Sequence, residues 1–317
     1  MKVLIVCSGN APDFKFEINQ AFVYDQVKAI SREFPEIYFD YFFIIGKGIC
    51  GYFSNLRRLQ RLIRSQHFDV IHAHVAYAGL LANFQRRVPV VCTFHGSDIN
   101  LMKTRCISAL VTMLSQKVIY VSRKLYSRAF IKGQHIIIPC GVDIAIFRPV
   151  DKVMAREQMH LNLKKKYILF SSSFGDKNKN FNLLKKACDL IQDNNIEIIE
   201  LKGFTREEVC FLMNSSDLCI LTSFREGSSQ FIKEAMACNC PIVSTDVGDV
   251  REVLEKTEGC YITDFDSPSV AEKLTKALEY SKSKGYTNGR QRIIDMELTS
   301  GQIAKRIVEV YKLCLSA

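Results

Sequence analysis

Short apolar runs alternate with segments of helical periodicity along this chain, and this alternation restricts the fold more than any other feature. Strands that are separated by helices pair in parallel, because the crossover between them needs a dozen or more residues. In the first half we expect strands at 2–7, 37–44, 69–73, 89–94, 117–121 and 135–139. Helices are expected between them, at 17–33, 54–65, 76–85, 104–115 and 123–131.

A second series of the same kind follows the polar stretch from Pro149 to about 166, which we interpret as a linker. After it we expect strands at 167–172, 196–201, 218–221, 241–245 and 260–262. Helices are expected at 180–193, 205–213, 230–238, 249–256, 268–283 and 300–316. A length of 317 residues also suggests two domains. The sequence therefore predicts an α/β protein with a parallel sheet in each half.

The composition favours a soluble, reduced protein. Hydrophobic residues make up 48% and charged residues 24% of the chain. No apolar run approaches the roughly 18 residues that span a bilayer. The twelve cysteines are scattered and form no Cys-x-x-Cys, so a cytoplasmic protein is a better interpretation than a disulfide framework.

The net charge of +10 lies entirely in the first half. Residues 1–150 hold 19 basic and 9 acidic residues, whereas residues 151–317 hold 24 of each. This asymmetry predicts an anionic partner. No aromatic-interleaved or helix-turn-helix pattern supports nucleic acid. An anionic membrane surface fits better, with each basic residue near it contributing roughly 1 kcal/mol.

The basic segment 53–66 has two interpretations that can hold together. Leu56, Leu59, Leu62 and Ile63 form an apolar stripe on the predicted helix, and arginines occupy the remainder. The helix can pack on the sheet with a solvated basic face, or that face can dock on a membrane. We therefore expect a cytoplasmic protein. If the basic face docks on a membrane, the protein would attach peripherally to the inner face of the plasma membrane.

The run from Thr222 to Ala237 carries the strongest indication of chemistry. Glu226 and Glu234 stand eight positions apart and bracket a Gly/Ser turn that opens a predicted helix. The free N–H groups of a helix start attract phosphate. Carboxylates on either side can accept hydrogen bonds from the hydroxyls of a sugar and a ribose. A ligand that combines phosphate with polyols, such as a nucleotide sugar, fits this pattern.

The same run resembles the Glu-x7-Glu signature of the family 4 retaining glycosyltransferases, one branch of which has the pattern E-G-S-P-x-x-I-K-E-A-M-A. Ser229 stands where that branch often has Pro. Segments 240–249, 70–74 and 93–98, and 138–143 with 147–149, resemble further parts of the family in the right order. The resemblance implies the GT-B fold, in which two Rossmann-like domains face a cleft and the last helix crosses back to the first domain.

Domain roles follow from the resemblance. Residues 1–150, with about 300–317, would form the acceptor-binding domain, and 151–299 the nucleotide-sugar donor-binding domain. On the donor side, Glu226 would contact the sugar and Glu234 the ribose. Backbone N–H groups of the small residues after Glu226 would meet the donor, as would the loop after the first strand. The residues concerned are Gly227, Ser228, Ser229 and Gly9.

The loop 170–180 occupies the place of the family's G-R-x-x-x-x-K-G loop. Lys179 aligns best with its phosphate-binding lysine and would stabilise the leaving diphosphate. The family's arginine is absent, since Ser173 or Phe174 stands there. Lys177 could substitute, as a point charge rather than a bidentate fork.

Histidines follow the central strands of the first half. The resemblance places His95 beside the donor sugar and acceptor, with a structural His bonded to backbone as the alternative. His72 and His74 alternate on one strand, so both point to one face, in the core or lining the acceptor side. Ser97 and Asp98 are further acceptor-side candidates. We take Glu226, His95 and Lys179 as the catalytic candidates.

The predicted activity is a hexosyltransferase-type transfer from a nucleoside diphosphate sugar to an acceptor hydroxyl with retention at the anomeric carbon. The acceptor would be a saccharide or lipid-linked saccharide of bacterial envelope polysaccharide or glycolipid assembly. No Asp-x-Asp stands where a metal would bridge the diphosphate, so we expect no metal or other cofactor. Two alternatives stay open: a nucleotide-sugar epimerase of GT-B fold, and a non-catalytic sugar-nucleotide-binding protein.

Overall fold

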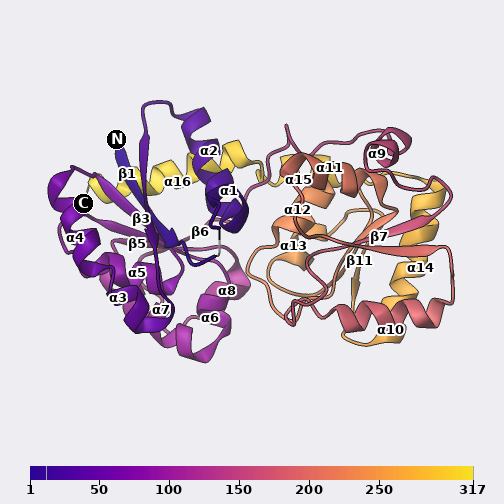
Figure 1. The fold of residues 1–317 in the computed structure, drawn as a ribbon, viewed down its shortest axis with the longest axis horizontal. Coiled ribbons are helices and arrows are strands. Elements are labelled where there is room, and N and C mark those ends of the chain that lie inside the picture. The colour runs from indigo at the N-terminus through magenta and orange to yellow at the C-terminus, as the bar shows by residue number, and fades with distance from the viewer. Residues whose placement is uncertain (12, 317) are drawn as a thin grey trace. The chain divides into compact units, whose positions relative to one another are not determined.

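The computed structural model describes residues 1–11 and 13–316, which divide into two compact units. Unit 1 comprises Met1–Gly141 and the terminal segment from Ser300. Unit 2 comprises Val142–Thr299. Each unit is an α/β structure with its own parallel sheet; in Figure 1 unit 1 runs from indigo to magenta with its terminal helix in yellow, and unit 2 runs from magenta to orange.

The sheet of unit 1 has the strand order β2-β1-β3-β4-β5-β6, and neighbouring strands are parallel. Its strands are β1 Lys2–Ser8, β2 Tyr38–Ile44, β3 Val70–His74, β4 Val90–Phe94, β5 Lys117–Tyr120 and β6 His135–Ile137. Each predicted strand of this half forms, within two residues of its predicted ends. The order reverses between β1 and β3, because the chain moves outward to β2 and then returns. Ligands of open α/β sheets bind at the carboxyl ends of strands beside such a reversal.

The helices of unit 1 are divided at points where the prediction had continuous helices or loops. The predicted helix 17–33 is broken at Gln20, and the segments after β2 and β4 each begin with a short extra helix. The helices are α1 Phe16–Asn19, α2 Ala21–Glu33, α3 Gly48–Phe53, α4 Leu56–Ser65, α5 Ala76–Asn83, α6 Ser97–Asn100, α7 Met102–Leu114, α8 Arg123–Ser127 and α16 Ser300–Leu315. The last helix, α16, packs on α2, as Figure 1 shows.

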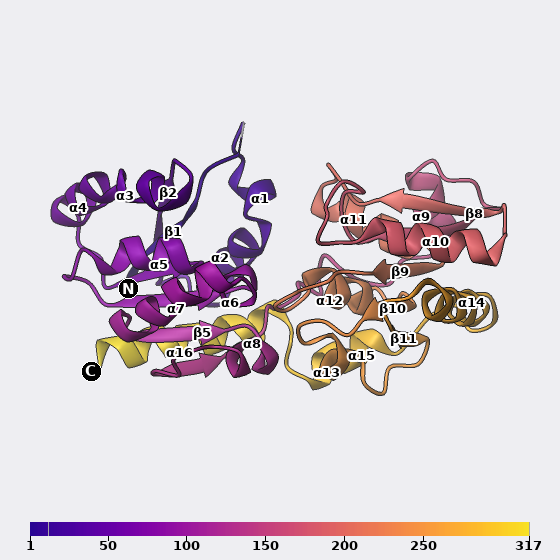
Figure 2. The same cartoon turned by 90° about the horizontal axis from the view of Figure 1, so that it is seen from below.

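Alternating side chains of the unit 1 strands enter two different layers. One set, including Leu4, Ile71 and Phe94, joins the core beneath α4, α5 and α7. Figure 2 shows α5 and α7 side by side on this face. The other set faces α2 and α16, and it includes His72, which contacts Tyr311 of α16. The side-chain period of two in a strand therefore fixes the layer that the histidines enter.

The sheet of unit 2 has the order β11-β10-β9-β7-β8, again with parallel neighbours. Its strands are β7 Lys166–Phe170, β8 Ile196–Glu200, β9 Leu218–Leu221, β10 Ile242–Thr245 and β11 Cys260–Thr263. They too agree with the prediction within two residues. The reversal of strand order falls between β7 and β9. Loops after these two strands are therefore expected to hold a ligand.

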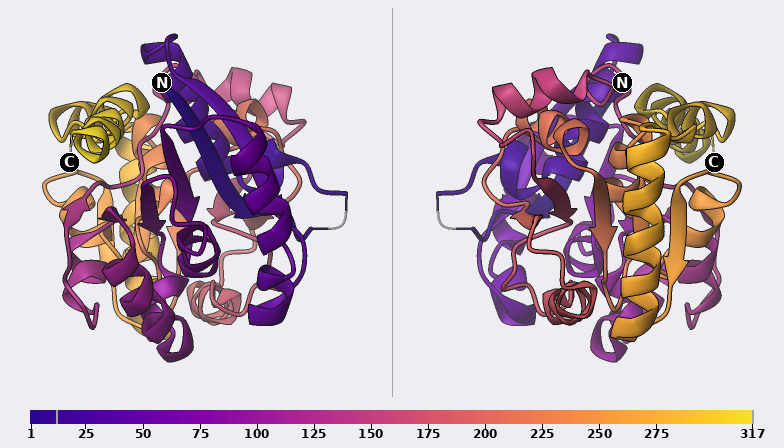
Figure 3. Two further views of the ribbon diagram at one scale, coloured as in Figure 1. Left: turned by 90° about the vertical axis from the view of Figure 1, so that its left-hand side faces the viewer. Right: turned by 90° about the vertical axis from the view of Figure 1, so that its right-hand side faces the viewer.

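The helices of unit 2 cover both faces of its sheet. On one face, α10 and α14 pack together on the apolar side chains of β7, β9 and β10, and α14 runs along the sheet in the right panel of Figure 3. On the other, α12 packs on β9 and β10. The helices are α9 Lys152–Gln158, α10 Phe181–Ile191, α11 Arg206–Ser215, α12 Gln230–Ala237, α13 Val250–Leu254, α14 Ser267–Ser283 and α15 Gly289–Asp295.

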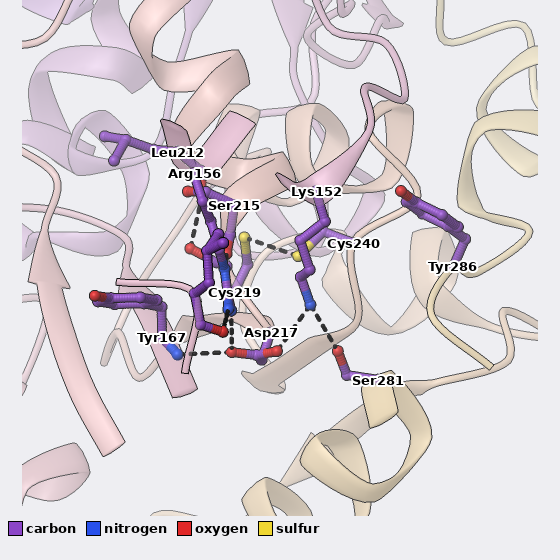
Figure 4. A network of polar contacts seen from close by, with 12 residues as sticks. Lys152, Arg156, Tyr167, Leu212, Ser215, Asp217, Cys219, Cys240, Ser281 and Tyr286 are labelled. Atoms are coloured by element: carbon purple, nitrogen blue, oxygen red, sulfur yellow. Dashed lines mark hydrogen bonds and ion pairs between the residues drawn. The ribbon is translucent and has the colours of Figure 1, made fainter. Parts of the chain in front are cut away.

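The linker prediction for 149–166 was wrong, because this stretch contains α9. Asp151 caps α9 by accepting from the N–H of Met154 at 3.0 Å. Arg156 and Lys152 of α9 then bind the two carboxylate oxygens of Asp217 at 2.9 and 2.8 Å (Figure 4). The charged residues that made this stretch look solvated anchor it to the start of β9 instead.

Candidate functional site

The loops after β7 and β9 meet at the reversal of strand order in unit 2. Lys179 follows β7 and Glu226 follows β9, and the Nζ of Lys179 lies 2.7 Å from Oε1 of Glu226. Both side chains are less than one-fifth exposed. The prediction placed these residues together only by resemblance to a family. The structure now brings a cation and a carboxylate together where an α/β sheet binds ligands.

Backbone contacts hold this ion pair in place. The N–H of Phe224 donates to the carbonyl of Asn178 at 2.9 Å, and the Asn178 side chain donates to the carbonyl of Arg225 at 2.9 Å. The hydroxyl of Thr222 donates to the carbonyl of Lys179 at 2.7 Å. These bonds link the two loops on both sides of the pair. Lys177 is exposed, so Lys179 is the lysine of this loop that lies in the site.

The start of α12 lies directly after Glu226. Ser229 is its N-cap and accepts from the N–H of Ile232, while Gly227 is buried. The free N–H groups of this first turn carry partial positive charge next to the Lys179 ammonium. The arrangement can bind an anion such as a diphosphate.

Glu234, one turn inside α12, is paired with an arginine that the sequence interpretation missed. Its side chain is 4% exposed, and Oε1 accepts from the guanidinium of Arg206 at 2.6 Å. Arg206 begins α11, whose first turn is fixed by a capping box between Thr205 and Glu208. Its guanidinium lies 4.7 Å from the ring centre of Phe147. The sequence does contain one signal for this arginine. The capping pattern Thr-x-x-Glu places Arg206 at a helix start on the carboxyl side of the sheet.

A second ion pair, which the sequence interpretation also missed, supports the turn between Glu226 and Glu234. Lys233 is fully buried, and its Nζ lies 2.8 Å from Asp249 and 2.5 Å from the hydroxyl of Ser228. The Ser228 hydroxyl also donates to Asp249 at 2.6 Å. Gly248, at φ +56°, lies so close that an added Cβ would meet the carbonyl of Gly227 at 2.6 Å. These contacts fix the backbone of the turn that leads into α12.

In unit 1 the loop after β1 lies at the other reversal of strand order. The N–H of Gly9 donates to the carbonyl of Ile44 at 2.8 Å. A Cβ added at Gly9 would meet Cβ of Phe43 at 2.9 Å, so this position favours glycine. The predicted role of Gly9 toward a donor stays a prediction. Pro12, the fourth residue after β1, lies outside the described residues.

Three predicted histidines gather at the carboxyl ends of β3 and β4. His72 and His74 are buried, and His95 is half-buried. Nδ1 of His74 lies 3.0 Å from Nε2 of His95, and the rings of His72 and His74 are 4.3 Å apart. Burial lowers the pKa of His72 and of His95 to about 3, and it lowers the pKa of His74 well below the ordinary range. All three rings are therefore neutral near pH 7.

The two remaining acceptor-side candidates differ in exposure. Ser97 is exposed, whereas Asp98 is buried. The Asp98 carboxylate accepts from the backbone N–H of Ala76 at 2.6 Å and of His95 at 2.8 Å. Burial raises the pKa of Asp98, and these N–H donors oppose the rise. Asp98 therefore connects the loops after β3 and β4 and orients the backbone of His95.

Within residues 1–11 and 13–316, no group of three or more His, Cys, Asp or Glu is arranged to hold a metal ion. No helix of that part of the chain has the length and apolar character that crossing a bilayer requires. The Asp217 network of Figure 4 lies at the starting ends of β7 and β9, opposite the Lys179 loop. It stabilises unit 2 and is no part of the candidate site.

Two α/β units, each with its own parallel sheet, are the architecture of the GT-B fold of glycosyltransferases. HepE of Anabaena, solved in complex with UDP-glucose, has this fold with a TM-score of 0.75 and 16% identity, covering 98% of this chain and 99% of that one. The family model described as Glycosyltransferase Family 4 matches residues 2–146, and that described as Glycosyl transferases group 1 matches residues 175–280. The chain belongs to the glycosyltransferase family that these two models describe.

Curated relatives agree with this assignment. An uncharacterized glycosyltransferase of Methanocaldococcus jannaschii is 26% identical over 260 residues, covering 73% of this chain and 72% of that protein. TuaC of Bacillus subtilis, which is named for teichuronic acid biosynthesis, is 24% identical over 242 residues. That match covers 67% of this chain and 62% of TuaC.

Proposed function

We propose that this glycosyltransferase moves a sugar, of hexosyl type, from a nucleoside diphosphate donor to an acceptor hydroxyl with retention at the anomeric carbon. The observation that carries the proposal is the pair of Lys179 and Glu226 beside the start of α12. Unit 2 is the donor-binding part in this proposal, and unit 1, including its terminal helix α16, binds the acceptor. The UDP-glucose bound by HepE supports a nucleotide sugar as donor.

Each group of the donor has a matching residue. Lys179 and the N–H groups of residues 227–229 meet the diphosphate, and Lys179 stabilises its charge as it leaves. Glu226, released from Lys179, accepts hydrogen bonds from hydroxyls of the sugar. Glu234 accepts from the ribose, with Arg206 keeping its buried charge neutralised when no donor is bound.

The proposed reaction needs no protein nucleophile. The bond from the anomeric carbon to the phosphate oxygen breaks, and the acceptor oxygen attacks that carbon from the same face. The acceptor proton passes to the departing phosphate oxygen, which becomes more basic as the bond breaks. His95 contacts the sugar as a neutral hydrogen-bonding group, and His72, His74, Ser97 and Asp98 shape its surroundings. No cofactor is required, because the charge of the diphosphate is met by Lys179 and the start of α12.

An acceptor in envelope polysaccharide or glycolipid assembly is supported by the name of TuaC. The basic face of α4 supports attachment to an anionic membrane by charge alone. Leu59 and Ile63 of α4 are buried in the core, whereas Arg57, Arg61 and Arg64 are exposed. Replacing these three arginines with Gln should abolish binding to anionic vesicles in low salt, and unchanged binding would contradict this attachment.

The assay begins with a thermal-shift screen of nucleoside diphosphates, since a ligand at 100 times its Kd adds about 2.7 kcal/mol of stability. Nucleotide sugars of the best base are then incubated with saccharide acceptors, and product stereochemistry is read by NMR. Glu226→Ala should lose transfer by at least about a hundredfold, and near-normal turnover would refute the proposal. Conversion of the donor without an acceptor would favour an epimerase. Binding without turnover across all acceptors would favour a non-catalytic protein.

A further inference from the structure

A line of contacts connects the terminal helix α16 to His95 through two buried histidines. Tyr311 of α16 lies 2.7 Å from Nδ1 of His72, and the hydroxyl of Thr93 lies 2.7 Å from its Nε2. The ring of His72 packs on His74 at 4.3 Å, and Nδ1 of His74 reaches Nε2 of His95 at 3.0 Å. His72 is thus fixed at both nitrogens by hydroxyls, which can donate or accept.

The bond between His74 and His95 contains one proton, because both rings are neutral. If His95 donated this proton, Nδ1 of His74 would be the acceptor, and His74 would carry its own ring proton on Nε2. That atom is buried and has no hydrogen-bond partner among the described residues. If His74 donates instead, its Nε2 holds only a lone pair. Buried N–H groups without an acceptor are rarer in proteins than under-satisfied acceptors. The geometry therefore favours His74 as donor.

We propose that His74 is a positioning residue, which donates its Nδ1 proton to Nε2 of His95 and so fixes His95 as the Nδ1–H tautomer. In this form His95 presents an N–H donor, rather than a basic lone pair, to an oxygen of the bound sugar. The use of that donor rests on the proposed function, but the tautomer itself does not.

The surroundings hold both rings in this arrangement. The ring centre of Phe22 on α2 lies 4.5 Å from that of His95 and 6.4 Å from that of His74, so this ring packs against the pair. Asp98 is the carboxylate nearest in sequence to His95, but it accepts from backbone N–H groups. Tyr311 of α16 and Thr93 of β4 bind His72, the neighbour of the pair, through hydroxyl groups that are neutral at pH 7.

The tautomer can be measured directly on the full-length protein labelled with ¹⁵N-histidine. Two-bond ¹H–¹⁵N correlations distinguish Nδ1–H from Nε2–H, and the His95→Gln variant assigns the signals among the six histidines. We expect wild-type His95 to be Nδ1–H. The variant His74→Leu should shift it to a mixture, whereas His74→Asn, whose amide nitrogen can stand near the Nδ1 position, should preserve it. A wild-type His95 with the proton on Nε2 would overturn the proposal.

Kinetics supply the second measurement. His74→Leu should lower kcat by about tenfold to a hundredfold with little change in donor KM, and His74→Asn should restore most of kcat. Equal kcat in His74→Leu and wild type would overturn the positioning role. If no donor is turned over by wild type, the proposed function fails, while the NMR result still decides the tautomer. Should His74→Leu not fold, the wild-type and His74→Asn spectra decide it.

Discussion

Removing the buried ammonium of Lys233 should destabilise unit 2 strongly. Lys233 is fully buried, and its Asp249 partner is 6% exposed at 2.8 Å. At an effective dielectric constant of about 20, this pair attracts by about 6 kcal/mol, which offsets the cost of burying two charges. In Lys233→Met, the Ser228 hydroxyl is the one remaining side-chain donor to the carboxylate among the described residues. We expect a loss of about 3–5 kcal/mol in the free energy of unfolding.

The double variant Lys233→Met/Asp249→Asn separates this cause from a packing effect. It removes both charges, so it should be more stable than Lys233→Met by about 2 kcal/mol or more. Lys276→Met is the control, because Lys276 forms an exposed i,i+4 pair with Glu272 on α14. Its stability should match that of the wild type.

Because Lys233 and Asp249 both belong to unit 2, the assay follows amide hydrogen exchange in the central strand β9 of that unit. Exchange there reports the free energy of opening that unit, and strand β4 of unit 1 serves as an internal reference. A Lys233→Met loss below about 1 kcal/mol would refute the reasoning. A double variant as unstable as the sum of the two single variants would refute it too.

Three further outcomes are expected. Lys179→Met should lower kcat by about a hundredfold to a thousandfold in steady-state transfer assays, because the leaving diphosphate loses its cation; a change confined to KM would contradict this. Arg206→Met should weaken nucleoside diphosphate binding in calorimetry, since it leaves Glu234 buried without its cation, and unchanged affinity would speak against the ribose role. Burial holds the pKa of His72 at about 3 against an ordinary 6.5, so the unfolded chain binds this proton first as pH falls. Stability of unit 1 should therefore be full above pH 6.5 and decline toward pH 3, by up to about 1.4 kcal/mol per pH unit for this ring. A His72→Gln variant with the same pH slope in hydrogen exchange of β3 would contradict this.

Much of the fold could be predicted from the sequence. Apolar runs such as 69–73 are too short for helices and lie between helical patterns, so they indicate parallel strands from local pattern alone. The run from Thr222 to Ala237 likewise predicts a helix start beside Glu226, because capping and turn chemistry are local. The period of two in a strand correctly placed His72 and His74 on one face.

Contacts between distant segments were decided by the tertiary structure. The polar stretch 149–166 was predicted as a linker, since its charges match a solvated segment, yet Asp217, some 60 positions later, anchors it as α9. The partner of Glu234 comes from Arg206 on another helix, and that of Lys233 from Asp249 after the next strand. The sequence alone determined which elements form, because propensity and periodicity act over a few residues. Which charges pair was determined by the folded chain, because only the order of strands in the sheet brings those loops together.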